Sequence, residues 1–462
     1  WRETKVLTAA EFISKRLGLS VQQFYTYLFL ALSLAYTGAF LYPVAVIVNV
    51  ATGFGIYEVI ILLGLLIILY TTVGGLWSVI VTDVLQFAIL TAAILIVVPL
   101  ALDNAGGLSE FVEKAPDGFF HLFSGEYSIG FIIAFAFYNM VFIGGNWAYV
   151  QRYTSVKDKQ SAKKVGYLFT ALYLISPVIW MLPPMLYRTI DPGLTGLENE
   201  AAYLLMVKDV LPIGMLGLML GGMVFATASS VNTTLNLAAA VVTNDIFKPL
   251  RPNASDKQLM IVGRLSTALF GVGTVGVALL VPRAGGIVEI VLSVAALTGA
   301  PLYAPPIWAL FSKTHTGRSI AFITIASLLV NLFFKFITPF VWNFGLDRAE
   351  EMILGVGGPL LMLLGYELWA LWRGKVSTSF THYEKVVAEE EDVTVKMQAK
   401  LDKNSLEQNK YGMKVISLAL AFTGALIFAL GFIAGEATIL VGSVGLVIMG
   451  TAYLVWRVGI QK

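Results

Sequence analysis

The chain contains no cysteine, only three histidines, and few charged residues: 13% of its 462 residues. Without cysteine it can form neither a disulfide nor a thiolate metal site, and three histidines are too few for a histidine-rich metal centre. Globular domains carry roughly 25% charged residues, so this chain lacks the polar shell that a soluble fold of its length needs. The net charge of +2 includes no basic block of the kind that binds nucleic acid.

Apolar residues are abundant instead. They make up 57% of the chain, and the mean hydropathy is +0.79. Apolar runs of about 20 residues recur throughout, each long enough to cross a bilayer as a helix. The runs do not alternate in polarity, so we expect helices rather than barrel strands. The sequence predicts an all-α polytopic membrane protein in the lipid bilayer, with about twelve spans at 21–50, 55–75, 78–102, 128–151, 165–187, 210–244, 259–281, 286–311, 318–341, 352–372, 413–433 and 437–457.

The basic residues indicate how these spans are oriented. Most of the 31 Lys and Arg residues lie in alternate loops, in the set that includes both ends of the chain, whereas the opposite loops are acidic. Because cytoplasmic loops carry the excess of Lys and Arg, we expect both ends of this chain to face the cytoplasm. The charged cytoplasmic loop at 375–412 is interpreted as a solvated and partly helical linker, with regulation as the alternative. The chain opens without Met, so we expect residues upstream of Trp1.

Residues 225–236, FATASSVNTTLN, place hydroxyl and amide side chains inside an apolar run. In a helix, Ala226, Ser229, Ser230 and Thr233 share one face, since they are spaced at i, i+3, i+4 and i+7. Neutral oxygens of this kind can hold a monovalent cation loosely enough to release it in each transport cycle. The alternative is hydrogen bonding to carbonyls one turn earlier, or contact between helices.

Other residues also break the apolar pattern. Asp83 is either a functional acidic residue or a hydrated residue at the cytoplasmic headgroup level. Gly144–Gly145, followed by Asn146, either breaks a helix so that freed backbone groups line a cavity, or permits close contact between helices. Lys335 and Glu367 lie near the ends of spans, where long side chains can reach the interface, and we assign them no role.

Three stretches, GGLWSVIVTDVLQ, NWAYVQRYTSVKD and FATASSVNTTLNLAAAVVTNDIFKPL, occur in an order that resembles the sodium/solute symporter family. That family includes the sodium–glucose, sodium–proline, pantothenate, iodide and sialic acid carriers. The resemblance implies a leucine-transporter-like bundle of two inverted repeats, with ligand sites near mid-membrane. The resemblance of TAAEFISKRLG to the loop after the second core helix implies an N-terminally truncated core of core helices three to ten at 1–311. Peripheral helices at 312–374, the charged loop at 375–412 and C-terminal peripheral helices at 413–462 follow.

The resemblance also implies sodium ligands. The family's common sodium site uses an Ala carbonyl and two Ser hydroxyls on the eighth core helix, which match Ala226, Ser229 and Ser230. Two further carbonyl ligands come from the first core helix, which this chain lacks. Members that move two sodium ions add an Asp on the fifth core helix and a Ser or Thr one turn beyond the serines. Asp83 and Thr233 match this second site.

The substrate pocket matches less well. Phe142 falls at the aromatic gate of the sugar carriers but has no hydroxyl, and Asn146 fits a polar pocket position. Trp147 replaces a frequent Gln, Tyr173 falls at the pocket Lys, and Leu292 falls at a Gln of the tenth core helix. These departures argue against sugar specificity without identifying another solute. We therefore take Phe142, Asn146, Trp147 and Tyr173 as the substrate-binding candidates.

The resulting hypothesis is a sodium-coupled secondary active symporter in the plasma or inner membrane. Its partners would be Na⁺ and a small polar solute such as a sugar or carboxylate, and it would have no catalytic residues. The alternative is a membrane sensor built on a symporter core. A membrane enzyme would need converging acids, bases or metal ligands in the spans, and the sequence lacks them.

Overall fold

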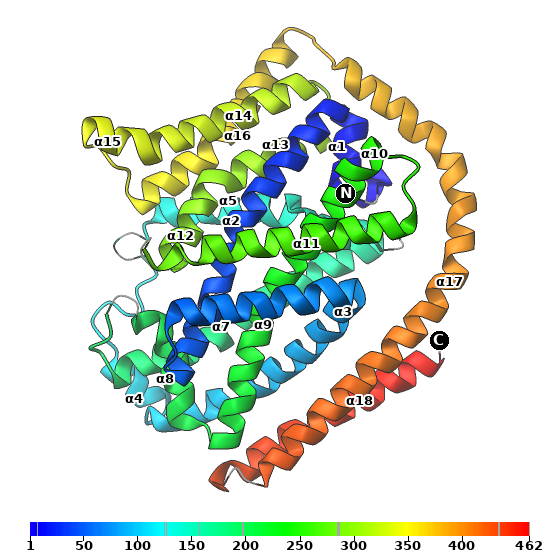
Figure 1. Cartoon of the computed structure of the whole chain (residues 1–462). Coiled ribbons are helices and arrows are strands. Elements are labelled where there is room, and N and C mark those ends of the chain that lie inside the picture. The colour runs from blue at the N-terminus through cyan, green and yellow to red at the C-terminus, as the bar shows by residue number, and fades with distance from the viewer. Residues whose placement is uncertain are drawn as a thin grey trace. The chain divides into compact units, whose positions relative to one another are not determined.

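The computed structural model describes residues 1–462 except 7, 124, 126, 157, 196–197, 284–286, 433–434 and 462. For a further set of helical residues only the backbone is described: 73–85, 198, 200, 213, 283, 287, 289–290, 386–410, 436 and 459–461. The described residues form helices and no strand (Figure 1). The α-helices are α1 Ala9–Leu17, α2 Leu19–Thr52, α3 Ile56–Asn104, α4 Gly107–Lys114, α5 Ile129–Gly145, α6 Trp147–Thr154, α7 Lys159–Ile190, α8 Glu198–Val210, α9 Ile213–Val241, α10 Lys248–Leu250, α11 Asp256–Ala278, α12 Ile287–Val294, α13 Ala300–Phe311, α14 Gly317–Leu332, α15 Thr338–Trp342, α16 Arg348–Trp372, α17 Thr378–Gly431 and α18 Thr438–Gln461.

Short helical segments of other types connect several of these elements. They include three π-helical segments, η2 Val242–Phe247, η4 Ala295–Gly299 and η5 Phe333–Ile337. The 3₁₀ segments are η1 Arg2–Thr4, η3 Val281–Arg283 and η6 Gly435–Ala437. Because π-segments inside α-helices free backbone carbonyls and often occur at functional sites, η4 is relevant to the candidate site below.

The helices confirm the expected membrane fold. Among the described residues, ten helices are long and apolar enough to cross a bilayer, and the pair α5–α6, bent by 54°, makes an eleventh. The shorter apolar stretch Ile56–Thr72 lies within the predicted span 55–75. The predicted spans 55–75 and 78–102 belong to one helical element, α3, so the backbone stays helical through Gly74–Gly75. The loop predicted at 375–412 is mostly helical, as the first part of α17, since no Gly or Pro interrupts residues 376–411.

The chain divides into two compact units. Unit 1 comprises Trp1–Tyr36, Phe120–Thr170 and Arg283–Lys396. Its core lies where α5, η4, α13 and α16 pack together, and it is built largely from small residues and aromatic rings. Gly299 adjoins the ring of Tyr138, and Gly355 adjoins the backbone of Ala296, so neither position has space for a Cβ. Small residues let these apolar helices approach closely.

Unit 2 comprises Thr37–Phe119, Ala171–Pro282 and Met397–Lys462. Helix α3 packs against both α9 and α11, again through glycines. A Cβ at Gly222 of α9 would overlap Ile89 of α3, and one at Gly271 of α11 would overlap Ile68. The polar face of α9 is therefore carried by a helix whose position is fixed by close packing on its neighbours.

Candidate functional site

The helix break at Asn146 is the first candidate site, and it lies in unit 1. Asn146 has φ −63° and ψ 130°, which ends α5 and begins α6. Its side-chain Oδ1 accepts a hydrogen bond from the backbone N–H of Ala148 at 3.0 Å, as an N-cap does. The carbonyl of Gly144 accepts a hydrogen bond from the indole N–H of Trp1. Backbone groups exposed by the break are thus satisfied by side chains.

The glycine pair Gly144–Gly145 lies at a helix break and also permits a close contact between helices, as the two interpretations of the sequence had it. The helix breaks directly after Gly145, and a Cβ at that residue would crowd Tyr303 and Ile307 of α13. The close approach brings the ring of Phe142 to 5.5 Å from that of Tyr303, edge to face at 82°. The amide Nδ2 of Asn146 donates to the hydroxyl of Tyr303 at 3.2 Å. The structure therefore brings two predicted substrate residues, Phe142 and Asn146, against the same tyrosine.

Further hydroxyls surround this point. The Tyr36 hydroxyl lies 3.1 Å from the Thr298 hydroxyl, which donates to the Val294 carbonyl at 2.7 Å. The ring of Tyr138 stacks on Phe142 at 5.6 Å. Our sequence analysis missed Tyr36, Tyr138, Thr298 and Tyr303. The proline-rich stretch around Pro301 is a local sequence signal near Thr298 and Tyr303.

Trp147 and Tyr173 are placed differently. Trp147 is buried and stacks on Phe29 with ring centroids 4.6 Å apart and an interplanar angle of 6°. This arrangement anchors α6 to α2. Tyr173 belongs to unit 2, where 53% of its surface is exposed. The Phe142–Tyr303 contact within unit 1 therefore includes two of the four predicted substrate residues, Phe142 and Asn146.

Side chains from neighbouring helices hold the π-segment η4 that carries Thr298. Asn331 of α14 donates to the Leu297 carbonyl at 2.9 Å, which satisfies a carbonyl freed by the π geometry. Lys335 pairs with Glu351 at 2.7 Å and donates to Ser293 at 3.0 Å. Lys335 thus ends in a partly buried ion pair, where sequence had suggested only a side chain reaching the interface. These contacts fix the helix that presents Thr298 and Tyr303.

The polar face of α9 is the second candidate site, and it lies in unit 2. Thr227 donates its hydroxyl to the Met223 carbonyl at 3.0 Å, and Thr234 donates to the Ser230 carbonyl at 2.9 Å. Back-bonding therefore explains these two threonines, and neither is a predicted sodium ligand. Among the described residues, the side chains of Ser230 and Thr233 form no such bond. The exposed Ser230 leaves its hydroxyl available to a ligand.

Asp83 belongs to the part of α3 whose side chains lie outside the described residues. Its helix is the direct neighbour of α9, as the close approach of Ile89 to Gly222 shows. Ala226 and Ser229 are partly buried on the α9 face, and Thr233 lies one turn beyond Ser229. No group of three or more His, Cys, Asp or Glu residues that could hold a metal ion occurs in the described part of the chain.

The family model of the sodium:solute symporter family matches residues 1–325. The chain belongs to the sodium:solute symporter family. Mouse (Mus musculus) sodium/glucose cotransporter 1 is 27% identical over 406 residues, covering 76% of this chain and 60% of the relative. Human (Homo sapiens) sodium-coupled monocarboxylate transporter 1 is 29% identical over 316 residues, covering 64% of this chain and 51% of the relative. The chain thus spans about half to three fifths of these relatives.

A solved structure has the same fold. It is a substrate-bound, outward-open Na⁺-coupled sialic acid symporter, with a TM-score of 0.65, 22% identity, and coverage of 79% of this chain and 78% of that chain. The expected family and the expected leucine-transporter-like helical bundle are both confirmed. As a member of this family of transporters, the chain is a multi-pass membrane protein and not an enzyme.

Proposed function

We propose that this sodium:solute symporter family chain functions in sodium-coupled secondary active symport of a small polar solute. The observation that carries the proposal is a difference in hydrogen bonding among the hydroxyl groups of α9. The hydroxyls of Thr227 and Thr234 donate to backbone carbonyls of the helix, whereas the exposed hydroxyl of Ser230 is available on the face that it shares with Ala226. A helix in lipid keeps an open hydroxyl at a cost, so a ligand on this face accounts for it.

The ion would be Na⁺, held by the Ala226 carbonyl and the hydroxyls of Ser229 and Ser230. Hard cations prefer oxygen ligands, and neutral oxygens release a monovalent ion readily. One helix surrounds only part of an ion, so the remaining oxygens have to come from other segments of the complete transporter. Each charge moved across 100 mV supplies about 2.3 kcal/mol for concentrating the solute.

Asp83 and Thr233 would form a second sodium site. The support is the resemblance to members that move two ions, together with the packing of α3 on α9. Thr233 lies one helical turn beyond Ser229 and on the same face, which supports its inclusion in this site. In this proposal the carboxylate of Asp83 compensates the charge of the second ion.

The solute would bind beside the α5–α6 break in unit 1. Phe142 offers an aromatic surface there, and Asn146 and Tyr303 offer an amide and a hydroxyl. A small solute with one apolar face and several hydrogen-bonding groups, such as a sugar or a carboxylate, fits this chemistry. The relatives' names cover both sugars and monocarboxylates, so they support the range and leave the choice within it to experiment.

The test compares two hydroxyls of α9 in sodium-dependent solute uptake by cells that express the protein. Ser230→Ala should raise the sodium concentration for half-maximal solute uptake several-fold, because it removes one proposed ligand. Thr234→Ala is the matched control: it removes a hydroxyl four residues along the same helix that is bound to the backbone. Its sodium dependence should equal that of the unmodified protein. An unchanged sodium dependence in Ser230→Ala, or equal shifts in both variants, would contradict the sodium assignment.

A further inference from the structure

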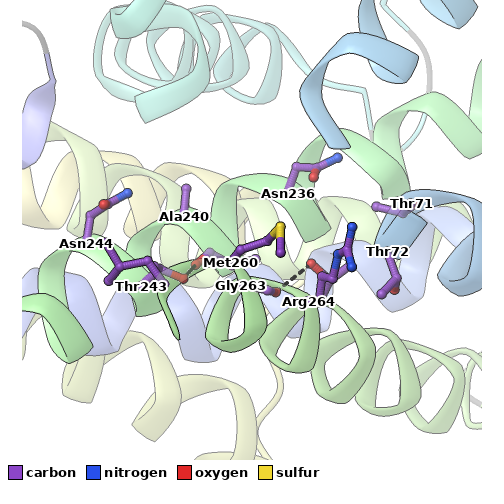
Figure 2. Close-up of a pocket in the computed structure, with 12 residues that line it drawn as sticks. Thr71, Thr72, Asn236, Ala240, Thr243, Asn244, Met260, Gly263 and Arg264 are labelled. Atoms are coloured by element: carbon purple, nitrogen blue, oxygen red, sulfur yellow. Dashed lines mark hydrogen bonds between the residues drawn. The ribbon is translucent and has the colours of Figure 1, made fainter. Parts of the chain in front are cut away.

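A cavity of about 390 Å³ lies within unit 2, between α3, the end of α9 with η2, and the beginning of α11. It is lined by Thr71 and Thr72 of α3, by Asn236–Asn244 residues of α9 and η2, and by Leu259–Thr267 residues of α11. By the distribution of basic loops, the junction of α9 with η2 and the beginning of α11 are predicted to lie on the cytoplasmic side, and Thr71 and Thr72 of α3 line the same cavity. The cavity is therefore predicted to open near the inner leaflet. Figure 2 shows its polar lining.

The cavity contains one cation, Arg264, which extends along its wall (Figure 2). Among the described residues, Arg264 forms no hydrogen bond and no ion pair. It lies eight residues into α11, about 12 Å along the helix from Asp256, and its side chain is exposed. A guanidinium without a protein partner at the wall of a recess is suited to an anion, since it offers a planar fork of donors.

Two more donors in the lining are unused. The hydroxyl of Thr71 is buried and has no hydrogen-bond partner among the described residues; the residue lines the cavity, and its hydroxyl meets a ligand there once the side chain rotates toward it. The side-chain amide of Asn244 is exposed and also has no partner among the described residues. A buried hydroxyl without a partner costs stability unless a ligand or water satisfies it. Together with Arg264 these groups form a set of donors that a phosphate or similar oxyanion would satisfy.

The rest of the polar lining presents acceptors. Thr72, Thr243 and Thr267 donate their hydroxyl protons to carbonyls one turn earlier, which leaves their oxygen lone pairs free. The side-chain amide of Asn236 donates hydrogen bonds to the backbone carbonyl and to Oδ1 of Asn232, so Oδ1 of Asn236 can accept a hydrogen bond from a ligand. A ligand that matches this lining carries an anionic phosphate and, beside it, hydroxyl or amine donors. The cavity is also much larger than a bare inorganic ion requires.

We propose that this cavity binds a phosphate diester with a hydroxyl- or amine-bearing headgroup, supplied by a glycerophospholipid of the inner leaflet. Arg264 binds the phosphate, Thr71 and Asn244 donate to its remaining oxygens, and the threonine and Asn236 oxygens accept from the headgroup. Basic pockets between membrane helices on the cytoplasmic side bind headgroups by this chemistry. The cavity lies beyond Asn236 on α9, so it is separate from the proposed sodium face at Ala226–Ser230.

The experiment measures lipid binding to the purified full chain in a neutral detergent. The probes are short-chain phosphatidylglycerol, phosphatidylcholine and inorganic phosphate, each titrated and followed by native mass spectrometry. Arg264→Gln should weaken phosphatidylglycerol binding about five-fold, the contribution typical of one basic residue near a membrane surface. Lys257→Gln is the matched control: it removes one positive charge from the exposed first turn of the same helix, outside the cavity.

Asn244→Asp gives a second variant that keeps the size of an exposed side chain and adds a repelling charge to the lining. It should weaken phosphatidylglycerol at least as much as Arg264→Gln does, at an unchanged melting temperature. Equal losses in Arg264→Gln and Lys257→Gln would overturn the site, because surface charge alone would then explain binding. Inorganic phosphate that binds as tightly as the lipid would overturn the lipid source and assign the cavity to free phosphate compounds. Equal binding of phosphatidylcholine would overturn the role given to the headgroup donors.

Discussion

His315 is a histidine with no solvent exposure, in the loop between α13 and α14 of unit 1. Its Nε2 lies 3.2 Å from the Leu363 carbonyl, which can only accept, so Nε2 carries the proton of the neutral ring. Nδ1 lies 3.1 Å from the Ser319 hydroxyl. Burial lowers the pKa of His315 and outweighs the nearby Glu367 carboxylate, which acts in the opposite direction. Arg16 also disfavours the imidazolium.

Arg16 and Glu367 are held in the same cluster. The guanidinium of Arg16 donates to the carbonyls of Ser312 at 2.8 Å and His315 at 3.2 Å. Glu367 accepts from the Ser312 hydroxyl and from the indole N–H of Trp308. The sequence had suggested that Glu367 merely reaches the interface, but its carboxylate ties α16 to the α13–α14 loop. A neutral His315 therefore completes a network of buried groups that join α1, α13, α14 and α16.

This network predicts that acid destabilises unit 1. The unfolded chain binds a proton at the ordinary pKa of histidine, about 6.5, whereas the folded chain binds it only at lower pH. The stability contributed by the neutral ring is present above pH ~6.5 and is lost as pH falls below it. The free energy of unfolding should fall by up to about 1.4 kcal/mol for each pH unit below the ordinary pKa of histidine. The melting temperature in detergent should therefore decline between pH 7.5 and 5.5. His315→Gln should flatten this decline, whereas the exposed His121→Gln should not. Identical pH profiles for all three proteins would refute the assignment.

At the scale of elements, the sequence predicted features that depend on residues close together along the chain. The glycine pair before Asn146 indicated either a helix break or a close helix contact, and the α9 face followed from helical spacing. The contacts that complete the site are not local. Asn146 meets Tyr303 across 157 residues, and Tyr36 meets Thr298 across 262. Spacing within one helix carries no information about which helices pack together, so these hydroxyls were missed.

The π-segments and the length of α3 were missed for a related reason. A π-segment such as η4 depends on partners elsewhere, here Asn331 donating to Leu297. The spans predicted at 55–75 and 78–102 were separated next to Gly74–Gly75, and glycine weakens an isolated helix by roughly 1 kcal/mol per residue. In an apolar environment that penalty is outweighed, since leaving backbone groups without hydrogen bonds costs several kcal/mol each. Helix propensity alone therefore predicts the boundaries of membrane helices poorly.

Asn146 combines two roles that substitutions can separate. Its Oδ1 caps α6 and its Nδ2 reaches Tyr303. Asn146→Ala should lose about 1 kcal/mol of stability with the cap and weaken solute binding by roughly 1–3 kcal/mol. Asn146→Ser keeps a capping oxygen but loses the amide, so its melting temperature should stay near that of the unmodified protein while its half-saturating solute concentration rises similarly. Uptake with unchanged solute affinity in both variants would leave Asn146 a cap and remove it from the solute site.

At the scale of the whole molecule, the strongest prediction from sequence is the orientation of the helices in the membrane. About twelve apolar segments were expected; among the described residues, ten spans, the bent pair α5–α6 and the shorter stretch Ile56–Thr72 lie at these positions. An even number of spans predicts that both ends of the chain lie on one side, and the basic loops predict that this side is the cytoplasm. The same assignment underlies the placement of the phosphate cavity near the inner leaflet, so an independent test of orientation bears on both.

The absence of native cysteine makes that test direct. Leu108→Cys, at the start of α4, and Thr195→Cys lie in the acidic connections between predicted spans and should react with a membrane-impermeant thiol reagent on intact cells. Gln160→Cys, at the start of α7, and Asn253→Cys lie in the basic connections and should react only after permeabilisation. All four side chains are exposed, so burial should not mask labelling. Asn253 is preferred to its neighbour Ser255, because Ser255 caps α11 in a reciprocal capping box. Labelling of positions 160 and 253 on intact cells would reverse the orientation and place the Arg264 cavity on the outer side, where no inner-leaflet headgroup could reach it.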